Sequence, residues 1–253
     1  MLLIALILPP AISAEEGNET PIAKDILEEA RDKQFPDNSI IDLTMVLINK
    51  RGNKRTRQLK TKRKTMSDGE AKSVAYFLSP ADVKGTAFLV WEHKDTDNDQ
   101  FIYLPALKKI RRIASSQKNQ SFMGSDFSYA DMENQDIDDA AHKMLPQQDL
   151  NGKPCWVIES IPKPDSDSEY GKMITWVTKK DLIPEKVDFY DKKGKLLKTM
   201  LVLRSGPVGE VILPLHFTMA NVQKNHKTEI ILDEVMLDQE LPDKEFTKRA
   251  IQR

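Results

Sequence analysis

Short runs of β-branched and aromatic residues, each bounded by turn residues, constrain the fold of this chain more than any other feature. Ser73–Leu78, Thr86–Trp91 and Gln100–Leu104 are such runs, and Ser-Pro, Lys-Gly and Asp/Asn stretches separate them. Apolar and polar residues alternate with a period of two from Ile41 to Leu47, and Arg51-Gly52-Asn53 then supplies a hairpin turn. These patterns predict antiparallel strands joined by short turns.

The same pattern continues through most of the remaining chain. Further strands are predicted at Lys54–Met66, Lys108–Ile113, Cys155–Ile161, Lys172–Thr178, Glu185–Tyr190, Lys195–Leu203, Glu210–Ala220 and Thr228–Leu237. From Ser121 to Leu145 the strand pattern fades, and we expect a loop with short helices there. One amphipathic helix precedes all strands, because Thr20-Pro21 is a typical helix start and helical spacing continues to Phe35. A meander of about ten or eleven strands tends to curl into a barrel or half-barrel.

The N-terminal segment predicts export from the cytoplasm. Residues 1–14 form a Leu- and Ile-rich run that ends in Ile-Ser-Ala before Glu15, so we expect a secretory signal peptide cleaved after Ala14. The alternative is an uncleaved N-terminal anchor, although the apolar run is too short to span a membrane. No linker divides the rest, so residues 15–253 are predicted to form a single domain.

Composition argues against several classes of protein. A net charge of −1 argues against a general attraction to nucleic acid or to anionic membranes. Cys155 is the only cysteine, so no intramolecular disulfide forms and the core must hold the fold together. The strand-like surroundings of Cys155 predict a small buried apolar residue rather than a reactive thiol.

No motif for catalysis or metal binding stands out. The histidines share no metal-ligand spacing, and although His142 near Asp138 and Asp139 permits a weak metal site, a solvated loop is the favoured interpretation. No Gly-x-Ser-x-Gly, dinucleotide-binding or phosphate-loop motif occurs. We therefore expect no enzyme activity, no metal and no cofactor. An envelope hydrolase stays open as an alternative, because catalytic triads are recognised by geometry rather than by spacing.

A basic run from Lys50 to Lys64 contains nine Lys and Arg residues and no acidic residue. The favoured interpretation is a solvated, charged strand that resists edge pairing. The second is a docking surface for an acidic partner or for lipid headgroups. A nucleic-acid groove is the least favoured, because the run contains no aromatic residue on which bases would stack.

Apolar residues at alternating strand positions predict a ligand cavity. In a small sandwich they would only form a core, but a strongly curved sheet has a concave face too wide for its own side chains to fill. The expected lining residues are Met45, Leu47, Phe88, Val90, Trp156, Trp176 and Phe217. Phe122, Phe127 and Tyr129 are expected to belong to a mobile lid over this cavity. An acyl chain buried there would gain about 0.8 kcal/mol per methylene group.

Several motifs give this chain a resemblance to a known family. They are Phe77-Leu78-Ser79-Pro80, Lys84-Gly85-Thr86-Ala87, Trp91-Glu92, Tyr103-Leu104-Pro105-Ala106, Arg111-Arg112-Ile113, Phe122-Met123-Gly124-Ser125-Asp126-Phe127-Ser128-Tyr129 and Asp131-Met132. With them the chain resembles the LolA-like outer membrane lipoprotein-sorting proteins, in the periplasmic branch often found with RND/MMPL-type exporters. The resemblance covers almost the whole chain from about Thr20 onward.

The resemblance implies a mainly β fold with a few helices, in which a curved antiparallel sheet forms an incomplete half β-barrel closed by helices, as in LolA and LolB. It also implies a periplasmic, non-catalytic carrier that binds lipid or lipoprotein acyl chains and transfers them between envelope membranes. Arg111 and Arg112 are expected to contact headgroups or a partner. The alternative function is a soluble accessory or adaptor subunit of an RND/MMPL-type inner-membrane transporter, without lipid cargo.

Overall fold

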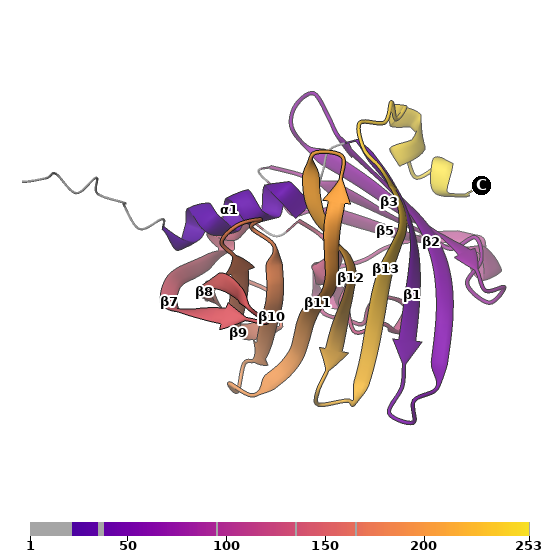
Figure 1. Cartoon of the computed structure of the whole chain (residues 1–253). Coiled ribbons are helices and arrows are strands. Elements are labelled where there is room, and N and C mark those ends of the chain that lie inside the picture. The colour runs from indigo at the N-terminus through magenta and orange to yellow at the C-terminus, as the bar shows by residue number, and fades with distance from the viewer. Residues whose placement is uncertain (1–21, 35–37, 95, 135, 165, 253) are drawn as a thin grey trace, which may run out of the picture.

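The computed structural model describes residues 22–34, 38–94, 96–134, 136–164 and 166–252, which form a curved antiparallel sheet of 13 strands and one α-helix (Figure 1). The elements are α1 (Ala23–Gln34), β1 (Ser39–Ile48), β2 (Lys54–Thr65), β3 (Ala71–Ser79), β4 (Ala87–Glu92), β5 (Asp99–Leu104), β6 (Lys109–Arg112), β7 (Ala140–Leu150), β8 (Lys153–Pro162), β9 (Tyr170–Thr178), β10 (Pro184–Asp191), β11 (Leu196–Val208), β12 (Val211–Asn221) and β13 (His226–Met236). The predicted signal peptide, residues 1–14, lies outside the described residues.

The chain builds the sheet from its centre to one edge, and then from the other edge back to the centre. The strand order is β6-β5-β4-β3-β2-β1-β13-β12-β11-β10-β9-β8-β7. β1 pairs with β13 in the middle, whereas β6 and β7 form the two edges, so the sheet is not closed into a barrel. The segment between β6 and β7, residues 113–134 and 136–139, is here called the insertion, and its apolar side chains pack on the concave side of the sheet.

The strand β4 is buried on both faces, which explains its nearly continuous apolar sequence. On the concave face, Phe88 and Val90 of β4 belong to the main apolar cluster. On the convex face, Leu89 packs in a second cluster together with Phe246 and Ile251. The C-terminal residues therefore cover the outside of this half of the sheet, in two short 3-10 turns.

α1 covers the concave face at the opposite half of the sheet. Its apolar stripe of Ala23, Ile26 and Ala30 is buried against Ile158 of β8 and Val177 of β9. This packing confirms the predicted amphipathic helix, whose proposed start at Thr20-Pro21 lies outside the described residues. Hydrophobic contact rather than intrinsic propensity stabilises a helix of only 12 residues.

One strand was not predicted. Ala140–Leu150 forms the edge strand β7, although the sequence pattern indicated a loop as far as Leu145. Most of β7 is exposed or half-buried, so its residues lack the apolar alternation of a core strand. Pro146 is tolerated because an edge strand leaves one side of its backbone unpaired. With β7 added to the twelve predicted strand segments, the sheet has 13 strands, more than the ten or eleven expected for the meander.

The expected class, a mainly β fold with a curved and open antiparallel sheet, is confirmed. Several helices were expected to close it, whereas the described residues contain a single α-helix and otherwise only 3-10 turns. None of the helices in the described part of the chain is long and apolar enough to cross a membrane. Cys155 is fully buried, and its burial raises the pKa of the thiol, as the prediction of an unreactive cysteine requires.

Candidate functional site

One half of the concave face is an apolar wall made of predicted cavity residues. Met45, Leu47, Phe88 and Val90 are buried in one cluster, and Phe217 packs against it. Their strands β1, β4 and β12 lie in the centre and in the β6 half of the sheet. The period-two pattern therefore identified the inward side of these strands correctly. We call these five residues the wall.

The predicted lid residues lie directly on the wall. The ring of Phe122 is 5.0 Å from that of Phe88 and 5.5 Å from that of Tyr129, between centroids. The ring of Phe127 is 6.4 Å from that of Phe217. Only 1% of Phe122 is exposed. We call residues 121–132 the plug, because their aromatic side chains fill the concave space above the wall.

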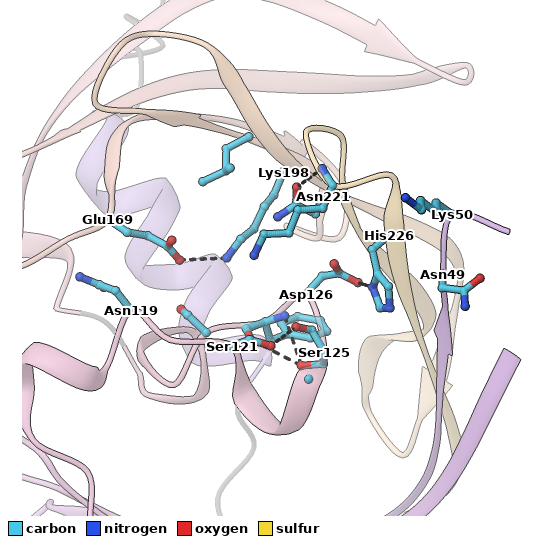
Figure 2. Close-up of a pocket in the computed structure, with 15 residues that line it drawn as sticks. Asn49, Lys50, Asn119, Ser121, Ser125, Asp126, Glu169, Lys198, Asn221 and His226 are labelled. Atoms are coloured by element: carbon cyan, nitrogen blue, oxygen red, sulfur yellow. Dashed lines mark hydrogen bonds and ion pairs between the residues drawn. The ribbon is translucent and has the colours of Figure 1, made fainter. Parts of the chain in front are cut away.

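Polar contacts attach the plug to the sheet. Arg57 Nη1 of β2 donates a hydrogen bond of 2.6 Å to the carbonyl oxygen of Met123. The Oδ2 atom of Asp126 lies 2.7 Å from His226 Nδ1 (Figure 2). The same oxygen accepts a 2.7 Å hydrogen bond from Thr228 Oγ1. Because these contacts join segments far apart in the sequence, they hold the plug in one position.

A buried charged network holds the other end of the plug. Lys198 of β11 donates to Tyr170 Oη and to Glu169 Oε1, both at 2.9 Å. The Tyr170 hydroxyl donates to Asp131 of the plug at 2.9 Å. Burial, together with the nearby carboxylates of Asp131 and Glu169, raises the pKa of Tyr170 far above its ordinary value. The hydroxyl thus stays protonated and serves as a permanent donor.

A cavity of about 1280 Å³, here called the hollow, lies beside α1 over β8 to β10 and extends across to Arg63 of β2 and Glu92 of β4. Met173 of β9 and Val187 and Phe189 of β10 provide an apolar floor, and Leu27 of α1 lines it as well. Most of the remaining lining is polar or charged, and it includes the ion pair between Arg63 and Glu92 at 2.7 Å. The hollow thus offers apolar surface and charge within one space.

Two predicted lining residues lie away from the wall. Trp156 pairs with Val177 and packs in the cluster under α1. Trp176 pairs with Val157 and with Lys186, whereas its neighbour Thr175 pairs with Val187 of the hollow. Directly paired residues share a face and successive residues alternate. Trp176 therefore lies on the convex face, and its prediction as a cavity residue was wrong.

The two arginines predicted to act together point to opposite faces. Arg111 pairs with Ile102, an inward residue of the main cluster, whereas Arg112 pairs with Phe101 of the convex cluster. Arg112 forms an ion pair of 2.6 Å with Asp99. Arg111 is exposed, acts electrostatically on Tyr129 of the plug and donates a hydrogen bond of 3.5 Å to Gln117. Of the two, only Arg111 is placed on the concave side.

The basic run is not simply a solvated strand, and for Arg57 that interpretation was wrong. Arg57 is only 4% exposed, because it points inward and bonds the plug. Arg63 also points inward, toward Glu92, whereas Lys60 and Lys62 bond Asp42 and Glu245. Because side chains alternate along β2, Arg57 and Arg63 lie on its concave face and Lys60 and Lys62 on its convex face.

The structure contains part of a hydrolase-like arrangement. His226 and Asp126 form a pair of the kind found in catalytic triads, but the hydroxyls of Ser121 and Ser125 donate to backbone carbonyl groups. No serine hydroxyl of the described chain is hydrogen-bonded to His226. Both ring nitrogens of His142 are engaged, by Ser160 Oγ and by the carbonyl of residue 137. Within the described ranges no group of three or more potential ligands forms a metal site.

Sequence reasoning missed the polar contacts that attach the plug to the sheet, which are made by Asp126, Asp131, Tyr170, Lys198 and His226. One signal was present in the sequence. Lys198 is two residues before Met200 on β11, so a charged residue lies on the same inward face as a core residue. The acidic partners come from the insertion, which has no periodicity. Their contacts with distant strands therefore could not be inferred from spacing.

Residues 69–253 match a family model described as "Uncharacterized protein". The chain is similar to the solved structure of an outer membrane lipoprotein-sorting protein domain from Vibrio parahaemolyticus, with 32% identity, a TM-score of 0.85 and coverage of 91% of this chain and 98% of that one. A DUF1329 family protein from Desulfovibrio piger has 29% identity, a TM-score of 0.86 and coverage of 90% and 97%. A LolA superfamily protein from Nitrosomonas europaea shares the fold at 21% identity, with a TM-score of 0.73 and coverage of 91% and 99%. No curated protein matches the chain.

Proposed function

Because this chain belongs to the family of the outer membrane lipoprotein-sorting protein domain and shares the fold of a LolA superfamily protein, we propose that it is a periplasmic, non-catalytic carrier of lipid or lipoprotein acyl chains. In this proposal residues 1–14 are a signal peptide that directs export, and residues 15–253 are the carrier domain. The carrier shields an acyl chain from water between two envelope membranes. An RND/MMPL-type exporter is the proposed partner in the inner membrane.

The hollow is the observation that carries this proposal. Pockets that hold drug-sized ligands measure about 300–1,000 Å³, and the hollow, at about 1280 Å³, is larger. Its floor of Met173, Val187 and Phe189 offers apolar surface on which a chain can lie. Each methylene group removed from water contributes about 0.8 kcal/mol, so a long chain binds without any polar contact.

The plug gives the carrier a second binding surface. We propose that the chain first occupies the hollow and then reaches the wall when Phe122, Phe127 and Tyr129 withdraw. An acyl chain would replace the apolar contacts that these rings make with Phe88 and Phe217. Loading then exchanges one apolar contact for another, so the cost of opening the plug is mainly that of its hydrogen bonds. Arg111, beside the plug, would face the headgroup or partner.

A substitution that fills the hollow tests the proposal. Thr175→Trp adds an indole to the floor of the hollow, whereas Ile174→Trp adds the same group to the opposite face of β9. Both variants and the wild-type chain are purified from the cell envelope without detergent, and bound lipid is identified by native mass spectrometry. We expect lipid on the wild type and on Ile174→Trp, and at least a several-fold loss on Thr175→Trp. A wild-type protein that carries no lipid, or equal loading of all three proteins, would contradict the proposal.

The filled wall favours a second candidate function. Because the plug leaves no free apolar surface above Phe88, the same fold also suits a soluble accessory or adaptor subunit of an RND/MMPL-type exporter without lipid cargo. That candidate predicts an empty hollow in the native mass spectrum and co-purification with an inner-membrane transporter. The loading experiment therefore separates the two functions.

A further inference from the structure

A second, smaller cavity of about 310 Å³ lies at one end of the half-barrel (Figure 2). It is enclosed by the plug and by the turns that join β1 to β2 and β12 to β13. These turns are neighbours because Ile48 pairs with Lys227 across β1 and β13. Asn119 and Glu169 line both this pocket and the hollow, so the two spaces adjoin. We call it the end pocket.

The end pocket carries uncompensated positive charge. Three lysines, Lys50, Lys198 and Lys224, line it together with two carboxylates, Asp126 and Glu169. Glu169 forms an ion pair with Lys198, and Asp126 is hydrogen-bonded to His226. Lys50 and Lys224 are exposed and have no ion pair within the described part of the chain. With His226 counted as neutral the lining has one excess positive charge, and the ammonium groups of Lys50 and Lys224 are free to meet an anionic ligand.

Asn221 adds a neutral donor to these lysines. It is only 3% exposed, and its Oδ1 atom accepts a hydrogen bond of 2.9 Å from the backbone N–H of Lys224. This contact fixes the amide, and its Nδ2 group has no hydrogen-bond partner among the described residues. The amide nitrogen of Asn221, beside Lys224, therefore offers a neutral donor to an oxyanion in the same pocket.

The electrostatic field at this end of the molecule favours the same kind of ligand. Residues 49–55 contain four Lys or Arg and no acid. The turn between β2 and β3 at the other end, residues 66–70, contains Asp68 and Glu70 and no basic residue. A chain with a net charge of −1 is thus strongly polarised, and its basic end attracts anions.

We propose that the end pocket binds the phosphate of an anionic lipid headgroup, which names the substrate class and rests on the carrier function proposed above. Lys50, Lys224 and the amide of Asn221 contact the phosphate oxygens. The acyl chains then run past Phe127 and Leu197, which line the pocket and pack on the main apolar cluster, toward the hollow and the wall. The lipid is therefore held at its headgroup by charge and along its chains by apolar contact.

Charge reversal at the two lysines tests this assignment. The double variant Lys50→Glu/Lys224→Glu is compared with Lys192→Glu/Lys193→Glu, which makes the same change of charge on a neighbouring exposed turn that does not line the pocket. Binding of dihexanoyl phosphatidylglycerol and of dihexanoylglycerol is measured by titration calorimetry. We expect the wild type and the control to bind dihexanoyl phosphatidylglycerol about tenfold more tightly than dihexanoylglycerol. The pocket variant should bind both lipids equally, and its affinity for dihexanoylglycerol should be unchanged.

The remaining outcomes separate the possible failures. If the wild type binds both lipids equally, or if the pocket variant keeps the preference, the headgroup assignment is wrong while the carrier function stands. If the wild type binds neither lipid, both proposals fail. Inorganic phosphate alone is titrated while the side-chain amide resonance of Asn221 is followed by NMR. Saturation at the same concentration as the anionic lipid would show a site for free phosphate and overturn the assignment to a lipid.

Discussion

The concave face is filled with side chains over the wall and is left open beside α1. Over the wall, the plug supplies aromatic side chains, so Phe122 and Phe88 are almost completely buried. Under α1, the space stays open, and an apolar floor faces charged residues across the hollow. A packed interior excludes water by dispersion contacts, whereas an open one must satisfy its polar groups with partners. The comparison indicates that the sheet is curved along its whole width and that the side chains of the insertion determine how much of the concave space is filled.

The difference in packing predicts unequal losses of stability. Phe122→Ala removes a ring that touches Phe77, Phe88 and Tyr129, and we expect a loss of about 3–5 kcal/mol in the free energy of unfolding. Met173→Ala, on the floor of the hollow, should cost clearly less, because one side of Met173 already faces open space. Urea denaturation of both variants measures the two losses. Equal losses would mean that the two halves are packed alike.

The next largest loss of stability is expected where the plug is attached to β2. Arg57→Ala removes the charged donor to the Met123 carbonyl, and we expect a loss of about 2–3 kcal/mol. The matched control is Lys60→Ala on the outer face of the same strand, where a half-exposed pair with Asp42 contributes less than about 1 kcal/mol. Hydrogen exchange should show faster exchange of plug amides only in Arg57→Ala. Unchanged exchange there would mean that Arg57 does not hold the plug.

The buried network at the far end of the plug predicts a moderate effect. Tyr170→Phe keeps the ring but deletes the hydroxyl between Lys198 and Asp131, which we expect to cost about 1–2 kcal/mol. Tyr190→Phe, on the same sheet but half-exposed, should change the stability very little. Thermal unfolding of both variants provides the comparison. An unchanged stability of Tyr170→Phe would indicate that the network rearranges around the lost hydroxyl.

The smallest effect is expected on the hollow side of the comparison. Lys24 of α1 and Asp138 of the insertion form an ion pair of 2.6 Å, but both side chains are largely exposed. Such pairs contribute little because water and salt screen them. Lys24→Ala should therefore leave the unfolding transition unchanged within error, at low and at high salt. A measurable loss at low salt would show that this pair helps to hold α1 over the hollow.

The sequence predicted the strands well and the insertion poorly, for one physical reason. In β1 and β4 the alternation of apolar residues reports directly which side chains face inward, so Met45 and Phe88 were placed on the wall correctly. In β9 both faces carry large apolar groups, and the parity of Trp176 could be assigned only from its pairing with Val157 and Lys186. The plug has no repeating pattern, so its contacts with β2, β11 and β13 depend on chain segments that meet only in the folded molecule.

By itself the amino-acid sequence determined the class of fold, the buried Cys155, the amphipathic helix and the inward face of most strands. These properties follow from local periodicity, because the side chains of a strand alternate and those of a helix recur every 3.6 residues. Only the tertiary structure decided that the plug fills the wall, that a hollow remains under α1, and that Lys50 and Lys224 meet at one pocket. Those facts depend on distances between segments up to about two hundred residues apart, which no local pattern encodes.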